Sequence, residues 1–166
     1  MAPGRPATTG WRRGRTRMRS VHDDIPEGFE PMPFQIGFVK QIGPLYLRRR
    51  EDRGDLGFRV GEQHLNPAGL CHGGVMMAVM DMAFGFAVMI AAGRQVFAPT
   101  INLTHDFLKP GREGDWLESE VNFTHNTPRM GFAQGFLNGP EGAVVRASGL
   151  MKLPRDGDAR FERKRP

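Results

Sequence analysis

One uninterrupted apolar segment dominates this sequence. It runs for 18 residues, from Val75 to Ala92, and its single charged side chain is Asp81. Alanine and methionine, which favour helices, recur along it, and Gly93 directly follows it, so the sequence predicts one long helix. A helix that is apolar all round is normally buried on all sides. We therefore expect the rest of the chain to wrap around this helix and to bury one carboxylate with it.

The same segment is just long enough to span a membrane, but its composition favours the core of a folded domain. A carboxylate near the middle, Asp81, would cost about 3 kcal/mol in lipid, and no Lys or Arg closely precedes the segment. The single cysteine, Cys71, excludes an internal disulfide and fits a reducing compartment. The N-terminus lacks the apolar stretch of a secretory signal. We expect a cytoplasmic protein without a membrane partner.

The basic composition is concentrated at the two ends of the chain. Residues 1–20 hold six arginines and no acid, residues 154–166 hold five basic and three acidic side chains, and the part between carries a net charge of about −3. A mildly acidic middle argues against nucleic-acid binding. We predict a basic disordered leader at 1–20 (or a start-site artefact, since Met18 offers a second start), an N-terminal arm with a short helix at 21–44, one folded domain at 45–153, and a charged disordered tail at 154–166.

Strand patterns flank the predicted helix on both sides. Before it, two short apolar segments separated by turn residues predict a hairpin. After it, alternating segments joined by Gly- and Pro-containing turns predict about four more strands. This order predicts an α+β fold, in which an antiparallel sheet folds around one long central helix. The predicted strands lie at 45–50, 56–60, 96–108, 116–125, 132–137 and 143–151.

The start of the predicted helix carries groups suited to acyl transfer. Gly73 and Gly74 leave backbone N–H groups open at a helix N-terminus, where they can polarise a carbonyl and hold an oxyanion. Asn66 can add a side-chain donor or orient a water molecule. A desolvated carboxylate at Asp81 can act as a base or as a nucleophile.

Each of these features also has a simple structural explanation. Asp81 can be a core carboxylate with local hydrogen bonds, His72 can cap the helix or hold the loop, and the two glycines can allow close packing. The methionines of the apolar segment are expected in the core. The histidines lack the spacing of metal ligands, so we expect no metal site; they are His22, His64, His105 and His125.

The spacing of Gly73 and Asp81 predicts a second subunit. They are eight residues apart, which on one helix is about 12 Å, too far for both to touch one carbonyl group. If both act in one site, the second group must come from another chain. The pattern therefore predicts a dimer with two shared sites, each combining Gly73 of one subunit with Asp81 of the other.

The pattern Asn66-x5-His72-Gly73-Gly74-x6-Asp81 resembles the signature of the hotdog-fold thioesterases, most of all the PaaI-like family of phenylacetic acid degradation. The resemblance covers roughly residues 45–153, including the segment from Thr100 to Pro110. It implies a five- or six-stranded antiparallel sheet around the helix, dimers joined edge to edge and usually paired into tetramers, and hydrolysis of an acyl-CoA. It implies no metal or redox cofactor.

The resemblance also implies roles for individual residues. Asn66 and the Gly73 N–H would bind the thioester carbonyl, and Asp81 of the partner subunit would be the nucleophile or general base. Thr100 would position the water, and His72 would hold the loop and help Asn66. Substrate-binding positions are expected next to this centre and in the CoA groove; they are Gly74, Lys109, Arg129 and Met130.

Two other functions remain open from the sequence. One is a hotdog protein that binds an acyl-CoA without turnover, although binding alone does not require a buried acid. The other is a hydratase or dehydratase on the same fold, which resembles a different pattern of a catalytic His paired to an acid. The sequence does not identify the acyl group of the substrate. Apolar side chains of the helix would suit an aromatic or medium-chain group; these are Met77, Met80, Phe84 and Phe86.

Overall fold

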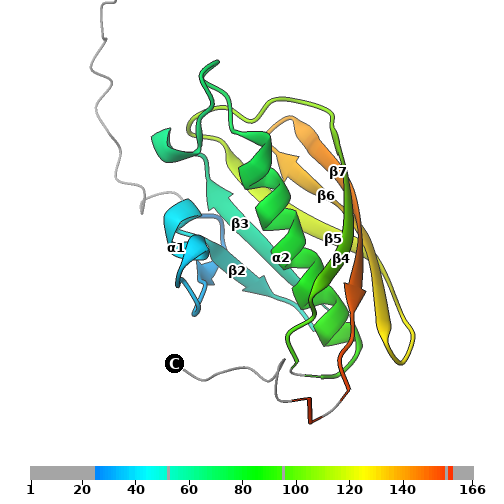
Figure 1. The fold of residues 1–166 in the computed structure, drawn as a ribbon. Helices are drawn as coiled ribbons and strands as arrows, with labels where there is room; N and C mark the ends of the chain where they lie inside the picture. Colours follow the sequence, from blue (N-terminus) through cyan, green and yellow to red (C-terminus); the bar gives the residue numbers. More distant parts are fainter. Residues whose placement is uncertain (1–24, 52, 95, 156, 159–166) are drawn as a thin grey trace, which may run out of the picture.

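The computed structural model describes residues 25–158 except 52, 95 and 156. The predicted leader at 1–20 and the end of the predicted tail, residues 159–166, lie outside the described residues. The described chain forms one antiparallel sheet that curves around a long helix, α2 (Figure 1). The predicted α+β hotdog architecture is confirmed.

The sheet has seven strands, in the order β1-β2-β3-β5-β6-β7-β4. The resemblance implied five or six, and the additional strand is β1, two residues long, which pairs with β2. Its proline hid it from the sequence pattern, although an edge strand tolerates one. The elements are β1 (Glu30–Pro31), α1 (Phe38–Ile42), β2 (Tyr46–Arg49), β3 (Gly54–Arg59), the 3-10 turn η1 (Glu62–His64), α2 (Gly73–Ala91), β4 (Thr100–Phe107), β5 (Trp116–Asn126), β6 (Met130–Gly139) and β7 (Gly142–Lys152).

One face of α2 forms the centre of the core. The side chains of that face pack on the sheet together with buried residues of β3, β5, β6 and β7. Glycines on the sheet allow the close approach, since a Cβ at Gly131 would lie 2.1 Å from Cγ1 of Val88 and one at Gly149 would lie 2.6 Å from the ring of Phe84. The buried residues of α2 are Met76, Val79, Met80, Ala83, Phe84, Ala87 and Val88.

The opposite face of α2 is not covered by the described residues. Asp81 is half-buried, and a Cβ at Gly85 would meet no atom within 4 Å. The expectation that the helix would be buried on all sides is therefore wrong for the single chain. By length and composition α2 could cross a membrane, but its buried face packs on the sheet. An apolar helix with one open face is suited to contact with another protein chain.

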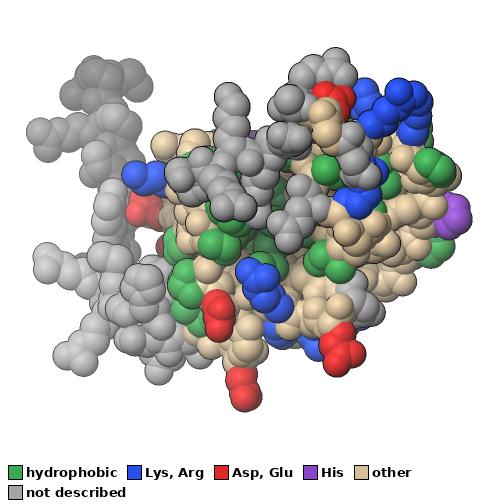
Figure 2. Space-filling view, turned by 90° about the horizontal axis from the view of Figure 1, so that it is seen from below, with side chains coloured by type: hydrophobic (Ala, Val, Ile, Leu, Met, Phe, Trp, Pro, Cys, Tyr) green, Lys and Arg blue, Asp and Glu red, His purple; other side chains and the backbone are tan. Residues whose placement is uncertain are grey.

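A cluster of charged side chains lies on the other side of the sheet from α2. The carboxylate of Asp55 on β3, 2% exposed, contacts the guanidinium groups of Arg48 at 3.0 Å, Arg50 at 2.7 Å and Arg53 at 3.4 Å. Arg48 also contacts Glu118 of β5 at 2.8 Å, which ties three strands together. At the end of the molecule where α2 terminates, basic, acidic and apolar side chains are intermingled (Figure 2).

We expect Asp55→Ala to lower the free energy of unfolding by about 2 kcal/mol, because it leaves partly buried arginines without their carboxylate. The arginines are 21% to 42% exposed, so water compensates part of the loss. Asp106→Ala is the matched control, since the Asp106–Arg146 pair is 48% and 65% exposed and should contribute less than about 1 kcal/mol. Urea unfolding of both variants measures the difference, and equal losses would contradict a structural role for the Asp55 cluster.

Candidate active site

The loop before α2 is held in a tight turn by the side chain of Asn66. Its Oδ1 accepts hydrogen bonds from the N–H groups of Ala68 at 2.9 Å and Leu70 at 3.2 Å. The backbone N–H of Asn66 donates to the carbonyl oxygen of Leu70 at 2.8 Å. Because the oxygen of the amide is used within the loop, its Nδ2 is the group left to donate to a ligand, with no hydrogen-bond partner among the described residues.

His64 stabilises the same loop through hydrogen bonds of its ring and its backbone. The N–H of Gly61 donates to Nδ1 of His64 at 2.9 Å, so Nε2 carries the proton and donates to the carbonyl oxygen of Ile42 at 2.9 Å. The carbonyl oxygen of His64 accepts from the N–H of His72 at 2.7 Å. Burial lowers the pKa of His64, which favours this neutral form. The sequence did not indicate this role, because Ile42 lies far away along the chain.

His72 caps the N-terminus of α2. Its Nδ1 accepts a hydrogen bond from the N–H of Gly74 at 2.9 Å, as expected for a side-chain helix cap. The expectation that the N–H groups of both glycines would stay open is therefore wrong for Gly74. The N–H of Gly73 has no partner among the described residues, and it is the one directed donor left at this helix end for a carbonyl oxygen.

The ring of Phe107 lies against Gly73. A Cβ at Gly73 would come within 3.0 Å of Cζ of Phe107, so any larger residue here would have to displace the ring. Phe107 is the last residue of β4, and it forms an apolar wall beside the open N–H. The sequence pattern does not indicate Phe107 as a site residue, because nothing near it shows that the end of β4 reaches the start of α2.

Asp81 and Thr100 form the second group of site residues. The hydroxyl of Thr100, at the start of β4, donates to Oδ1 of Asp81 at 2.5 Å. Asp81 projects from the side of α2 next to the edge strand β4, beside the face that the sheet does not cover, and is half-buried. The structure thus brings together Asp81 and Thr100, two residues that the sequence analysis had assigned to the chemistry. A carboxylate oriented by one hydroxyl retains lone pairs for a water molecule or a substrate.

The two groups of residues lie on the same helix but at different turns. Gly73 opens α2 and Asp81 follows eight residues later, about 12 Å along the axis. One subunit therefore carries two half-sites, a donor half with Asn66 and Gly73, and an acid half with Asp81 and Thr100.

The residues predicted for the CoA groove do not come together in one subunit. Lys109 follows β4 near the start of α2, and its Nζ donates to the carbonyl oxygen of Glu141 at 2.5 Å. Arg129 and Met130 lie at the start of β6, where Gly131 packs on Val88 near the other end of α2. Fifteen residues of helix separate these ends, about 22 Å. Within one subunit, Lys109 and Arg129 cannot hold the same phosphate.

Cys71 does not provide a nucleophile at this site. Its side chain is buried, and burial together with the charge of Asp115 raises the pKa of the thiol to about 11. A thiol with that pKa is almost fully protonated at neutral pH, and the protonated form is a poor nucleophile.

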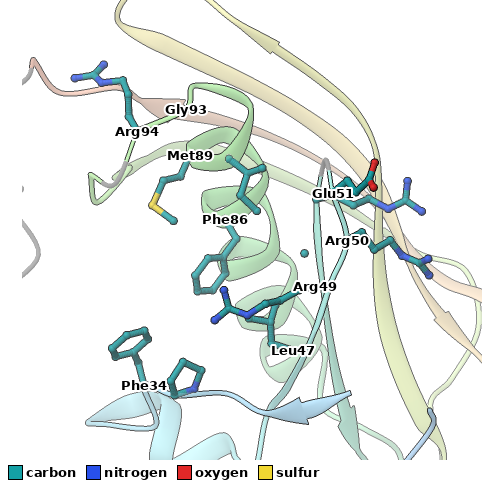
Figure 3. Close-up of a pocket in the computed structure, with 13 residues that line it drawn as sticks. Phe34, Leu47, Arg49, Arg50, Glu51, Phe86, Met89, Gly93 and Arg94 are labelled. Atoms are coloured by element: carbon teal, nitrogen blue, oxygen red, sulfur yellow. The ribbon is translucent and has the colours of Figure 1, made fainter. Parts of the chain in front are cut away.

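A cavity of about 430 Å³ opens beside the C-terminal half of α2 (Figure 3). Phe34 of the N-terminal arm and Phe86 of α2 line it, and the side chain of Arg49 points into it. Phe84 and Met80, two of the apolar residues that would suit an acyl group by sequence, are fully buried core residues. Phe86 is thus the residue of that group that lines a cavity; the other apolar lining residues include Leu47, Met89 and Ile90.

The chain is similar to proteins of one superfamily. The profile of the thioesterase superfamily matches residues 68–135. Over 132 residues the chain is 32% identical to PA0474 of Pseudomonas aeruginosa, a protein named provisionally as an esterase, and the match covers 79% of this chain and 98% of that protein.

Solved structures share the fold. The PaaI protein from the phenylacetic acid degradation operon of E. coli is 26% identical, with a TM-score of 0.54, and the match covers 61% of this chain and 72% of PaaI. A hypothetical thioesterase protein from Streptococcus pneumoniae, solved with coenzyme A, is 21% identical with a TM-score of 0.58, covering 66% of this chain and 85% of that one.

Proposed function

We propose that this chain, which belongs to the hotdog-fold thioesterase superfamily and is PaaI-like, hydrolyses an acyl-CoA to a free acid and CoA. Thioesterases act on a carbonyl group, and the two half-sites on α2 supply complementary chemistry for that reaction. The crystal structure of the S. pneumoniae protein with coenzyme A, on the same fold, supports an acyl-CoA as the substrate.

The observation that carries the proposal is the open N–H of Gly73 at the N-terminus of α2. Together with Nδ2 of Asn66 it offers two donors to the carbonyl oxygen of a thioester, and the helix N-terminus adds partial positive charge. As water attacks, the negative charge that develops on this oxygen is stabilised more than the neutral carbonyl was. The C–S bond then breaks, and CoA leaves as its thiolate, which takes up the proton of the water.

Asp81 supplies the base or the nucleophile in this proposal. As a base, it takes the proton of the water that attacks the thioester carbon. As a nucleophile, it forms an acyl-aspartyl anhydride that water then hydrolyses. In both routes the hydroxyl of Thr100, 2.5 Å from Oδ1, fixes the orientation of the carboxylate. His72 keeps the helix start in place through the N–H of Gly74.

Each active site in our proposal combines the donor half of one subunit with the acid half of another. The separation of about 12 Å between Gly73 and Asp81 requires it. Two features of the subunit support a partner of the same kind: the face of α2 beside Asp81 is left uncovered by the described residues, and the edge strand β4 exposes apolar side chains. Ile101 and Phe107 of β4 are 52% and 51% exposed, and an open strand edge can pair with a second chain.

We further propose that the acyl group occupies the cavity beside Phe86. Phe86 lies five residues beyond Asp81 on α2 but faces β2 and β3, whereas Asp81 faces β4. This assignment therefore rests on the apolar lining of the cavity and not on direct reach from Asp81. Apolar walls favour an aromatic or medium-chain group, and Arg49 favours one that carries an oxygen at its far end.

The test is release of CoA by the full-length protein from aromatic, short, medium and long acyl-CoAs, with the free acid identified by mass spectrometry. We expect turnover that is fastest with aromatic or medium-chain groups. Binding of these esters without release of CoA would favour a non-catalytic binding protein instead. Consumption of an enoyl-CoA by hydration, without cleavage of the thioester, would favour a hydratase.

A further inference from the structure

One partly buried side chain, whose ring nitrogens are both buried, has no place in the mechanism described above. His105 lies on β4 opposite Ala147 of β7, on the face of the sheet that α2 covers. Its ring stacks on that of Phe107 at a centroid distance of 6.5 Å, and Phe107 in turn lies against Gly73. Both ring nitrogens of His105 are buried, and neither has a hydrogen-bond partner among the described residues. Buried polar atoms of this kind normally bind a water molecule or a ligand.

Two carboxylates act on the ring of His105. His105 lies on β4 between the two points where this strand meets α2, Phe107 against Gly73 and Thr100 against Asp81. Burial, the largest effect, lowers the pKa of His105, whereas the charges of Asp81 and of its neighbour Asp106 favour the protonated imidazole. Arg146 of β7 is bound to Asp106 at 2.7 Å and neutralises much of that charge. The ring is therefore neutral at neutral pH. A neutral imidazole has one nitrogen that donates and one that accepts a hydrogen bond.

We propose that His105 is a positioning residue that holds the reacting water next to Asp81. This inference rests on the proposed hydrolysis. The water oxygen forms the new C–O bond, the C–S bond breaks, and the proton of the water passes through Asp81 to the departing thiolate. The free nitrogen of the neutral ring accepts a hydrogen bond from this water, or its N–H donates one, and orients it toward the acyl carbon. The imidazolium lacks an acceptor and, as a cation beside Asp81, makes the carboxylate a weaker base.

A role in packing alone would not explain a histidine here. Leu103 and Phe107, on either side of it along the same face of β4, are apolar. An apolar side chain at position 105 would avoid burying two polar atoms without partners. We therefore expect His105→Leu to keep or raise the thermal midpoint while it lowers activity, a combination that a structural role would not produce.

Three variants test the proposal: His105→Leu, His105→Gln and, as a matched control, His125→Leu on the exposed face of β5. For each variant kcat and KM are measured from pH 5 to 9. We expect His105→Leu to lower kcat by about tenfold or more with KM within about twofold, because the water loses its orientation. His105→Gln, which keeps a donor and an acceptor, should recover part of the loss, and His125→Leu should resemble the wild type.

The pH profile separates positioning from structure. Because the pKa of His105 is lowered from 6.5, activity that needs the neutral ring is complete above that pH and is lost as pH falls through the lower value. This loss of activity at low pH should appear in the wild type and be absent in His105→Leu. A wild type that turns over acyl-CoA, with a His105→Leu variant of equal kcat and the same acid limb, would overturn the proposal and leave the proposed function intact.

A second measurement does not depend on turnover. The pKa of His105 is followed by NMR titration of its ring protons, which are assigned by their loss in His105→Gln. Since the charge of Asp81 raises this pKa, Asp81→Asn should lower it further. An unchanged value would overturn the proposal even if His105→Leu failed to fold. A wild type that hydrolyses no thioester would instead refute the proposed function, and this inference with it.

Discussion

Replacing Asp81 by Asn lowers kcat for acyl-CoA hydrolysis by about a hundredfold or more, the scale expected for loss of a general base. The amide cannot accept a proton and is a poor nucleophile. It still offers an oxygen to the hydroxyl of Thr100, which lies 2.5 Å from Oδ1 in the structure. The fold and the binding of the substrate are therefore retained, and the loss should appear in kcat rather than in KM.

The matched control for this variant is Asp106→Asn. Asp106 belongs to β4, as Thr100 does, but its carboxylate is bound to Arg146 and is 48% exposed. We expect kcat of the control to stay within about threefold of the wild type, because an exposed ion pair contributes little. A loss of less than tenfold in a folded Asp81→Asn protein would show that Asp81 is not the base or nucleophile.

The second large effect is expected at Asn66. Removing one donor to an oxyanion typically lowers kcat by about a hundredfold or more. Asn66→Ala would also remove the acceptor of two loop hydrogen bonds, because the N–H groups of Ala68 and Leu70 donate to Oδ1 of Asn66 at 2.9 and 3.2 Å. Asn66→Asp is the sharper variant, because a carboxylate can still accept both bonds but has no donor for the thioester oxygen.

Comparison of the two Asn66 variants distinguishes chemistry from loop structure. We expect Asn66→Asp to keep the thermal midpoint and to lose kcat, while Asn66→Ala loses both. If the aspartate variant retained most of the activity, Asn66 would act through the shape of the loop alone, and the Gly73 N–H would be the one remaining donor of the donor half.

The sequence predicts the local features of this protein well. Asp81 is the single charge in a long apolar segment, and His72 directly precedes two glycines, so the helix and its cap follow from neighbouring residues. The strands follow from alternation in the same way. The prediction that the N–H of Gly74 is open is wrong for a local reason, because Nδ1 of a histidine at the cap position can accept a hydrogen bond from it.

Contacts between distant segments were not predictable from the pattern. Nothing near Gly73 indicates that Phe107 lies against it, because that contact depends on β4 joining the sheet beside β7 and running along α2. The sequence offers His105 only as a histidine without metal-ligand spacing, and its position between β4 and α2 depends on the same arrangement. The uncovered face of α2 was missed because composition shows how apolar a helix is but not what covers each side.

Mixing two inactive variants tests the shared site most directly. Asp81→Asn and Asn66→Asp proteins, each with a different affinity tag, are allowed to exchange subunits, and the mixed dimers are verified by tandem purification. With equal mixing, half of the dimers are mixed, and each contains one site with both residues intact, so the mixture should recover about a quarter of the wild-type activity by two-fold symmetry. Verified mixed dimers without activity above that of either variant would contradict a site built from Gly73 of one subunit and Asp81 of the other.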